Sequence, residues 1–341
     1  MSVVSTPEPM VTAPAMPRAT RSRAAILREY QAIKSGVGYR HLDDRLVIRV
    51  TGDDRAAFLH GMCTADIKGM VPGQVAPALF VTERAHIIRD FHAYALPDAL
   101  LLEIDRDAWP AVRAHLEKFL VADDVEMEER ETLVVIDCEG PASAATLCDA
   151  GLLPAPLAAW RFAPPNLLAH LPRLGGPAFT FLVERRVADD ILSRLAAAGM
   201  TELGPEACEI VRIEHGLARV GIDTTDKTLA LEARCEPAIT LNKGCYLGQE
   251  TLERATARGG IKRRLGGLKV EGGRVPAIGA AIMLADKPVG LLTSVAESPA
   301  CGIIGLAIMH HSAWAEGTVV RLPGTDSEIT ARVAELPFIK R

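Results

Sequence analysis

The C-terminal part of the chain places the strongest constraint on its fold. After Lys262, short apolar segments alternate with turns that contain glycine or proline, up to the C-terminus. Segments of this length between regular turn signals are typical of strands and are too short for most helices. We therefore predict an all-β domain over residues 262–341, in which a barrel or a sandwich pairs the strands.

The residues before this domain predict mixed structure. Helical periodicity is expected from Ala24 to Gly36, and apolar residues alternate with polar ones over Leu46–Val50 as in a strand. Further strands are expected at 76–81, 86–95, 99–104, 131–140 and 178–186, and further helices at 56–62, 107–120, 188–199 and 204–223. This order favours an α+β region with two subdomains over residues 24–261 and argues against a doubly wound sheet.

The first 23 residues differ in composition from the rest. They are rich in proline, serine, threonine and alanine, and they lack the compact apolar stretch of a signal peptide. Such a composition buries too little apolar surface to offset the entropy of ordering, so we predict a disordered tail over residues 1–23. A transit peptide remains an alternative because acidic residues are few, although an arginine-rich amphipathic helix is missing.

Charge and cysteine content exclude several classes of protein. The net charge is -5, which gives no sign of a nucleic-acid coat, and no apolar run reaches the roughly 18 residues that cross a membrane. The seven cysteines are odd in number and form no C-x-x-C pair, so a reducing compartment is expected: the cytoplasm, or an organellar matrix in a eukaryote. His310 and His311 have no ligand partners at metal spacing, and we predict no metal site.

The stretch TLNKGCYLGQETLERATARGG, residues 240–260, contains one cysteine, Cys245. We expect a strand at Ala238–Leu241 and a helix at Leu247–Arg258, with a turn between them. Cys245 then falls at or just before the helix N-terminus, where the helix dipole and Lys243 would lower the pKa of its thiol. The alternative is that Cys245 is a small buried hydrophobic residue in a tight turn.

The octapeptide KGCYLGQE, Lys243 to Glu250, resembles the K-G-C-Y-x-G-Q-E signature of the YgfZ-type folate-binding proteins. These proteins are paralogues of the glycine-cleavage T-protein, a tetrahydrofolate-dependent aminomethyltransferase. Three further segments resemble family motifs in the same order: LVIRVTGDDRAAFLHGMCTADI, VRIEHGLARVGID and KPVGLLTSVAESPACGIIGLAIM. Together they cover most of the chain from Leu46 to Met309, and the octapeptide is the most specific of the four.

The resemblance implies a three-part fold: a split N-terminal α+β region, a ferredoxin-like part and a C-terminal β-barrel around a central folate channel. It also implies that Glu214 binds the pterin, a pairing that suits a carboxylate. The T-protein has two adjacent aspartates on one strand, whereas this chain has Arg89 and Asp90. Asp90 is therefore either a remaining catalytic acid or a strand-face charge paired with Arg89 or His92.

The expected folate-binding residues are Glu214, Lys243, Tyr246, Gln249, Arg254 and Arg258. Arg254 and Arg258 belong to a basic cluster that also includes Lys262, Arg263 and Arg264, and this cluster would attract the glutamate tail of a folate. The alternative for the cluster is a solvated surface. The expected cofactor is tetrahydrofolate or a derivative of it.

Three functions agree with these features. The first is a tetrahydrofolate-binding accessory protein for the assembly or maintenance of iron-sulfur proteins, including tRNA-thiolating enzymes, in which Cys245 is the functional thiol. The resemblance implies iron-sulfur client proteins as partners in that case, and one cysteine cannot hold a cluster because clusters take about four protein ligands. The second is a folate-dependent aminomethyl- or methyltransferase that uses Asp90. The third is a non-catalytic folate sensor.

Overall fold

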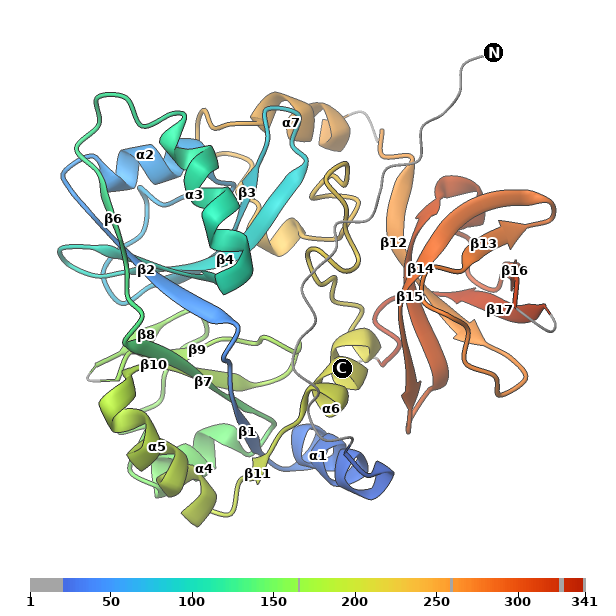
Figure 1. Cartoon of the computed structure of the whole chain (residues 1–341), viewed down its shortest axis with the longest axis horizontal. Coiled ribbons are helices and arrows are strands. Elements are labelled where there is room, and N and C mark those ends of the chain that lie inside the picture. Colours follow the sequence, from blue (N-terminus) through green and yellow to red (C-terminus); the bar gives the residue numbers. More distant parts are fainter. Residues whose placement is uncertain (1–20, 165, 258–259, 325–327, 340–341) are drawn as a thin grey trace.

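The computed structural model describes residues 21–164, 166–257, 260–324 and 328–339, which form three units (Figure 1). Two α+β units lie on the left of the figure and a β-barrel lies on the right. Within the described ranges, no helix is both long and apolar enough to cross a membrane. The α+β architecture with a C-terminal barrel confirms the predicted fold class.

The first α+β unit is a five-stranded antiparallel sheet with two helices on one face. The sheet order is β3-β4-β5-β2-β6. The bounds are β2 Arg45–Thr51, β3 Val75–Val81, β4 Ile87–Ala95, β5 Leu100–Asp105, β6 Glu126–Glu129, α2 Arg55–Met62 and α3 Trp109–Glu117. A 3-10 helix, η1, spans Arg106–Ala108 between β5 and α3.

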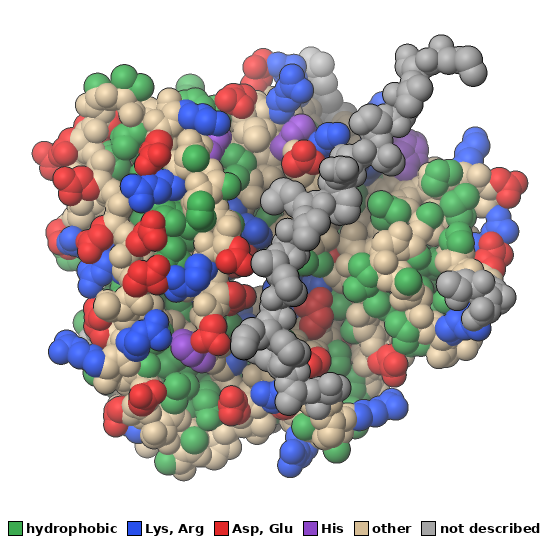
Figure 2. Space-filling model, in the orientation of Figure 1, with side chains coloured by type: hydrophobic (Ala, Val, Ile, Leu, Met, Phe, Trp, Pro, Cys, Tyr) green, Lys and Arg blue, Asp and Glu red, His purple; other side chains and the backbone are tan. Residues whose placement is uncertain are grey.

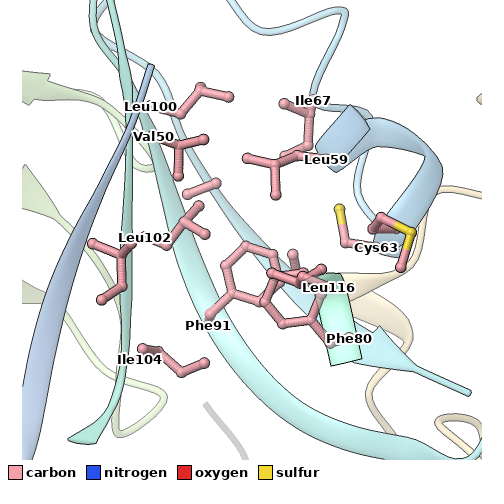
Figure 3. Packing of buried hydrophobic residues seen from close by; sticks show 14 of the residues in the cluster. Val50, Leu59, Cys63, Ile67, Phe80, Phe91, Leu100, Leu102, Ile104 and Leu116 are labelled. Atoms are coloured by element: carbon pink, nitrogen blue, oxygen red, sulfur yellow. The ribbon is translucent and has the colours of Figure 1, made fainter. Parts of the chain in front are cut away.

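The core of this unit lies between the sheet and its two helices (Figure 3). Phe80 of β3 and Phe91 of β4 stack with ring centroids 4.2 Å apart. Leu59 of α2 and Leu116 of α3 pack onto the same face of the sheet. Leu46, Ile48 and Val50 of β2 face this core from every second position, because successive side chains of a strand point to opposite faces. Their alternation is the pattern from which the sequence predicts this strand.

The second α+β unit is a six-stranded sheet of order β11-β1-β7-β10-β9-β8. Its strands are β1 Gly38–His41, β7 Leu133–Glu139, β8 Phe162–Ala163, β9 Leu168–His170, β10 Ala178–Glu184 and β11 Thr201–Glu202. The helices α4 Ser143–Asp149 and α5 Arg185–Ala197 share one apolar core with the sheet. The helices α1 Arg23–Ser35 and α6 Pro205–Glu214 pack against each other beside it. Residues 141–176, which carried no clear pattern, contain α4, β8 and β9.

The N-terminal region is split between the two sheets, as the family resemblance implies. The chain enters the six-stranded sheet at β1, leaves to build the whole five-stranded sheet, and returns at β7. β1 and β7 then pair antiparallel, with Gly38 opposite Glu139. An apolar cluster joins the facing sides of the two sheets and includes Val47 and Tyr94 from one sheet and Val135 from the other.

The third unit is a closed six-stranded barrel of order β12-β15-β14-β13-β16-β17. Its strands are β12 Arg263–Val270, β13 Ala281–Leu284, β14 Lys287–Ser298, β15 Gly302–His310, β16 Val319–Leu322 and β17 Ile329–Ala334, with a 3-10 helix η3 at His311–Ala313. Leucine, isoleucine and valine side chains from these strands fill the interior. The predicted all-β domain is therefore a barrel, in which closure removes the exposed edges of the sheet.

The helix predicted for residues 204–223 is too long. Helix α6 ends at Glu214, because Gly216 follows with φ of 67° and its backbone N–H bonds to the carbonyl of Ile213. A glycine in this left-handed conformation is a common helix stop. The chain then runs as turns and loops up to helix α7, Gln249–Ala257, apart from a 3-10 helix η2 at Glu236–Ala238.

The predicted tail falls mostly outside the described residues. Its last three residues are structured, because α1 begins at Arg23 and Ser22 is its N-cap, accepting a hydrogen bond from the backbone of Ala25. Arg21 forms an ion pair with the buried carboxylate of Glu29, at 2.5 Å. A truncation that tests the tail must therefore end before Arg21.

A buried ion pair fastens α6 to the barrel. The guanidinium group of Arg212 donates to the carboxylate of Asp223 and to the hydroxyl of Ser294 on β14, each at 2.7 Å. Asp223 also accepts from the hydroxyls of Ser294 and Thr293, at 2.7 and 2.5 Å. Arg212 and Asp223 are both buried, so each charge depends on the other.

Replacing Arg212 with alanine is expected to destabilise the protein strongly. Asp223 would be left buried without its cation, which costs about 3–5 kcal/mol. Arg321 is a matched control because it forms ion pairs on the exposed surface of the barrel, where Arg321→Ala is expected to cost about 1 kcal/mol or less. Urea unfolding followed by circular dichroism measures both changes. Equal losses in the two variants would contradict the role given to Arg212.

Candidate functional site

A cleft of about 660 Å³ lies where α1, α6 and the end of β7 meet. Pockets of a few hundred to about a thousand Å³ are typical of sites for small molecules and cofactors. Its wall includes the polar or aromatic side chains of Lys34, Glu139, Trp160, His170 and His215. The cleft therefore combines flat aromatic surfaces with a few polar groups, which is the usual composition of a ligand site.

Glu139 is the most unusual residue of this cleft. It is the last residue of β7 and is only 1% exposed, yet neither oxygen of its carboxyl group has a hydrogen-bond partner among the described residues. Burial and the neighbouring charge of Asp137 raise its pKa well above the usual range, and the opposing effects of Arg40 and Arg173 are smaller. The uncharged carboxylic acid is therefore favoured at this position.

A chain of buried ion pairs runs from the cleft into the space between the two sheets. Asp137 on β7 pairs with Arg40 at 2.9 Å and with Arg173 at 3.5 Å. Arg173 also bonds to Glu103 on β5, which pairs with Arg45 on β2 at 2.7 Å. Burial alone would raise the pKa of Glu103, but Arg173 and Arg45 hold it well below its usual range. The Glu103 carboxylate thus stays charged although it is fully buried.

Glu214, the predicted pterin ligand, lies behind the wall of the cleft. Its carboxylate is fully buried and accepts hydrogen bonds from the hydroxyls of Tyr30 and Ser298, at 2.8 and 2.6 Å, and from the amine of Lys34, at 3.3 Å. Burial and the Glu214 charge together raise the pKa of Tyr30. Of these four residues, Lys34 lines the cleft. The structure therefore connects Glu214 to the cleft through the Lys34 amine.

The secondary structure predicted around Cys245 is wrong in two places. No strand forms at residues 238–241, because the 3-10 helix η2 ends at Ala238 and the chain runs beside Thr64, whose hydroxyl donates to the carbonyl of Ala238. Helix α7 begins at Gln249 and not at Leu247. Arg258, at the predicted end of this helix, lies outside the described residues.

Tertiary contacts explain the later start of α7. The backbone N–H of Leu247 bonds to the carbonyl of Gly61 at the end of α2, at 2.9 Å. Gly248 has φ of 82°, and a side chain there would lie 2.7 Å from the carbonyl oxygen of Thr82. Residue 248 can lie this close to the backbone of Thr82 only if it is a glycine, and helix α7 begins immediately after this residue.

Lys243 and Cys245 have different surroundings. The amine of Lys243 donates to the carbonyl of His60 and lies 4.6 Å from the ring centroid of Tyr246, and burial lowers its pKa. Cys245 is exposed, so the alternative of a buried cysteine is also wrong. It precedes the first residue of α7, Gln249, by four positions.

The remaining predicted folate-binding residues gather around the signature segment and not around the cleft. Tyr246 is buried, which raises the pKa of its hydroxyl to about 12, and Gln249 bonds to Glu253 at 2.6 Å. Arg254 pairs with Glu250 on the exposed face of α7. None of Cys245, Lys243, Tyr246, Gln249 and Arg254 is among the described residues that line the cleft.

The basic residues predicted to receive a folate tail are mostly engaged elsewhere. Arg263 pairs with Glu232 at 3.1 Å, and Arg264 lies over the ring of Trp314 at 4.6 Å. On the face shown in Figure 2, acidic and basic side chains are interspersed over the α+β units. Because Arg254, Arg263 and Arg264 each have a partner within the protein, the solvated-surface interpretation of the basic cluster is favoured.

Asp90 lies on β4 and is half-buried, and it has no hydrogen bond or ion pair with the other described residues. The pairings considered from the sequence do not form. Arg89 bonds instead to the carbonyl of Val220, at 2.6 Å, and to the carboxylate of Asp105, at 3.0 Å. Burial and the charge of Asp90 raise the pKa of the Cys235 thiol to about 12. Asp90 thus remains a candidate acid that has no hydrogen bond or ion pair with the described part of the chain.

All seven cysteines are free. Cys138 and Cys208 are buried, and burial raises the pKa of both thiols, as predicted from their apolar surroundings. Two cysteines are exposed, Cys148 on α4 and Cys245 in the signature segment. These two thiols are therefore the ones that another macromolecule can reach.

Glu139 and the aromatic wall of the cleft were not identified from the sequence. A signal was present for Glu139. Asp137 and Glu139 stand two positions apart in the apolar segment LVVIDCEG, so both carboxyl groups face the same side of a buried strand. Trp160 gave no comparable signal, because it lies in the stretch where no element could be placed.

Comparisons with known proteins agree with this fold. The chain matches the GCVT N-terminal domain over residues 9–158 and the glycine cleavage T-protein C-terminal barrel domain over residues 263–340. A chloroplast protein of Arabidopsis thaliana named "Putative transferase" is 30% identical over 304 residues, which are 86% of this chain and 69% of that protein. The aminomethyltransferase of Thermosynechococcus vestitus is 26% identical over 93% of this chain and 89% of its own length.

Among solved structures, aminomethyltransferase T of the glycine cleavage system from Bartonella henselae has a TM-score of 0.84. The match covers 92% of this chain and 89% of that one at 23% sequence identity, and it establishes a shared fold. A split α+β region followed by a closed barrel defines this architecture. The chain belongs to the glycine cleavage T-protein family.

Proposed function

We propose that this protein binds a reduced folate in the cleft beside Glu214 and serves as an accessory protein for iron-sulfur proteins, in the manner of the YgfZ-type branch of the family. The observation that carries folate binding is the composition of the cleft. Its volume of about 660 Å³ suits a ligand of this size, Trp160 offers a flat aromatic face, and Lys34 and Glu139 offer polar contacts.

The chemistry of a folate matches these groups. A pterin is planar and stacks on an aromatic side chain, while its polar edge needs fixed hydrogen-bond partners. Lys34 presents a cation at the wall, and the buried carboxylate of Glu214 holds that cation in place at 3.3 Å. Glu214 is therefore a positioning residue in this proposal and acts on the ligand through Lys34. The aminomethyltransferases among the relatives support the choice of a folate.

An accessory role is supported by the separation between the thiol and the cleft. Cys245 is exposed and is not among the described residues of the cleft wall. A thiol in this position is accessible to a partner protein, whereas attack on a carbon unit of the bound folate requires contact with it. In this proposal Cys245 therefore contacts a client protein and not the one-carbon position of the folate.

A second candidate function is one-carbon transfer. It is favoured by Asp90, a half-buried carboxylate that is free of partners among the described residues, and by the aminomethyltransferases among the relatives. An assay of aminomethyl or methyl transfer with tetrahydrofolate distinguishes the two functions. Transfer that is lost in Asp90→Asn and kept in Cys245→Ser would establish the second candidate in place of the first.

Folate binding is expected to quench the fluorescence of Trp160. Titration with 5-formyltetrahydrofolate, a stable reduced folate, should lower the emission of the wild-type protein with saturation. The Trp160→Phe variant should lose most of this change, because the other two tryptophans lie outside the cleft. Trp314→Phe is the matched control and should keep the quenching. Saturable quenching that persists in Trp160→Phe would place the ligand elsewhere.

Cys245 is expected to be required for the accessory role. In a strain that lacks the protein, Cys245→Ser should bind folate normally but should not restore the activity of iron-sulfur enzymes. Cys148→Ser is a matched control, since Cys148 is the other exposed thiol and should restore activity fully. Full restoration by Cys245→Ser would rule out a thiol-dependent mechanism and would leave a folate sensor or a transferase.

A further inference from the structure

We propose that Glu139 binds the ligand of the cleft as an uncharged carboxylic acid, pairing with a lactam edge in which an N–H group and a carbonyl group lie side by side. Glu139 is thereby a specificity-determining residue of the site. The identification of the lactam with the pterin ring rests on the proposed function. The hydrogen-bonding role of Glu139 rests on its own surroundings.

The backbone holds Glu139 firmly at the cleft. As the last residue of β7, it pairs with Gly38 of β1 on one side and with Ala178 of β10 on the other. Glycine and alanine have little or no side chain, so neither neighbour covers the carboxyl group from within the sheet. The group is buried, has no hydrogen-bond partner among the described residues, and belongs to the wall of the cleft.

The donors around Glu139 are already committed to Asp137. The carboxylate of Asp137 accepts from the hydroxyl of Thr180 at 3.0 Å and from Arg40 at 2.9 Å, and it forms an ion pair with Arg173 at 3.5 Å. Together these contacts occupy both of its oxygens. An ionised Glu139 would place a second negative charge two residues away without a cation of its own, which explains why its pKa is raised.

The other titratable groups near Glu139 do not supply a counter-charge. Lys34 of α1 pairs with Glu214. On β9, the Nδ1 atom of His170 lies 2.9 Å from the carbonyl oxygen of Leu157. His215, the residue after α6, lines the cleft and makes contacts of its own. On α6 itself, burial raises the pKa of the Cys208 thiol to about 12. Arg173, between β9 and β10, bonds to Glu103 as well as to Asp137.

An uncharged carboxylic acid has one O–H donor and one carbonyl acceptor on adjacent atoms. A lactam edge has the complementary pair, so two parallel hydrogen bonds form at once. An ionised carboxylate has only acceptors and would repel the carbonyl of the lactam. The protonation state of Glu139 therefore selects the edge of the heterocycle, and no proton or other group is transferred in the complex.

The test compares Glu139→Gln with Glu139→Leu by calorimetric titration with 5-formyltetrahydrofolate. A glutamine amide has the same donor and acceptor pair as the uncharged acid, so Glu139→Gln should keep the wild-type affinity within about threefold at neutral pH. Leucine has similar size without polar atoms, and Glu139→Leu should weaken binding roughly tenfold or more. Glu202→Gln, on the exposed strand β11, is the matched control and should bind like the wild type.

The pH dependence gives an independent readout. Wild-type affinity should fall as the pH rises through the raised pKa of Glu139, because ionisation removes the O–H donor. Glu139→Gln should lack this fall, whereas any pH dependence of the affinity that comes from His170 or His215 would appear in both proteins. Thermal melting of each variant verifies that it is folded. Titrations between about pH 6 and about pH 9 cover the range in which a raised carboxyl pKa is observable.

Three outcomes would overturn the inference. If Glu139→Gln loses as much affinity as Glu139→Leu, the binding form is the ionised carboxylate. If folded Glu139→Leu binds like the wild type, Glu139 does not contact the ligand, although the proposed folate site stands. If the wild-type protein does not bind 5-formyltetrahydrofolate at all, the proposed function fails and the assignment of Glu139 to a pterin fails with it.

Discussion

The structure depends on two carboxylates that water does not reach, Glu103 on β5 and Asp137 on β7, and on Arg173, which bonds to both. Removing one partner of such a network leaves an uncompensated buried charge, which has a large free-energy cost. That cost fixes how the five-stranded and six-stranded sheets face each other. The same network commits the nearby cations to Asp137, which leaves Glu139 at the cleft with a raised pKa and without a hydrogen-bond partner among the described residues.

A second set of buried polar contacts joins the α+β region to the barrel. Arg212 and Glu214 lie two residues apart on α6 and both reach β14, Arg212 through Ser294 and Glu214 through Ser298. Glu214 also binds Tyr30 and Lys34 of α1. Arg212 and Glu214, which belong to a motif that resembles a ligand-binding signature, therefore hold α1, α6 and the barrel strand β14 together. The cleft lies beside this junction, so a ligand bound in it would contact elements that the junction positions.

Much of the fold could be predicted from the sequence, because alternation of apolar residues and glycine turns are local signals. The start of α7 could not, since it depends on the close approach of Gly248 to Thr82, a contact between distant segments. The candidate site also depends on contacts between distant segments, which local signals do not show. The motif singles out Glu214 as a candidate, but no local pattern shows that its carboxylate is fully buried. Glu139 could have been found as the second acid on one face of a buried strand.

The central claim is that a reduced folate occupies the cleft between α1, α6 and β7. The most direct test is a crystal structure of the protein with 5-formyltetrahydrofolate. The account predicts a pterin stacked on Trp160, with its lactam edge within hydrogen-bond distance of Glu139. A folate bound against Cys245 or Asp90, with the cleft empty, would contradict it.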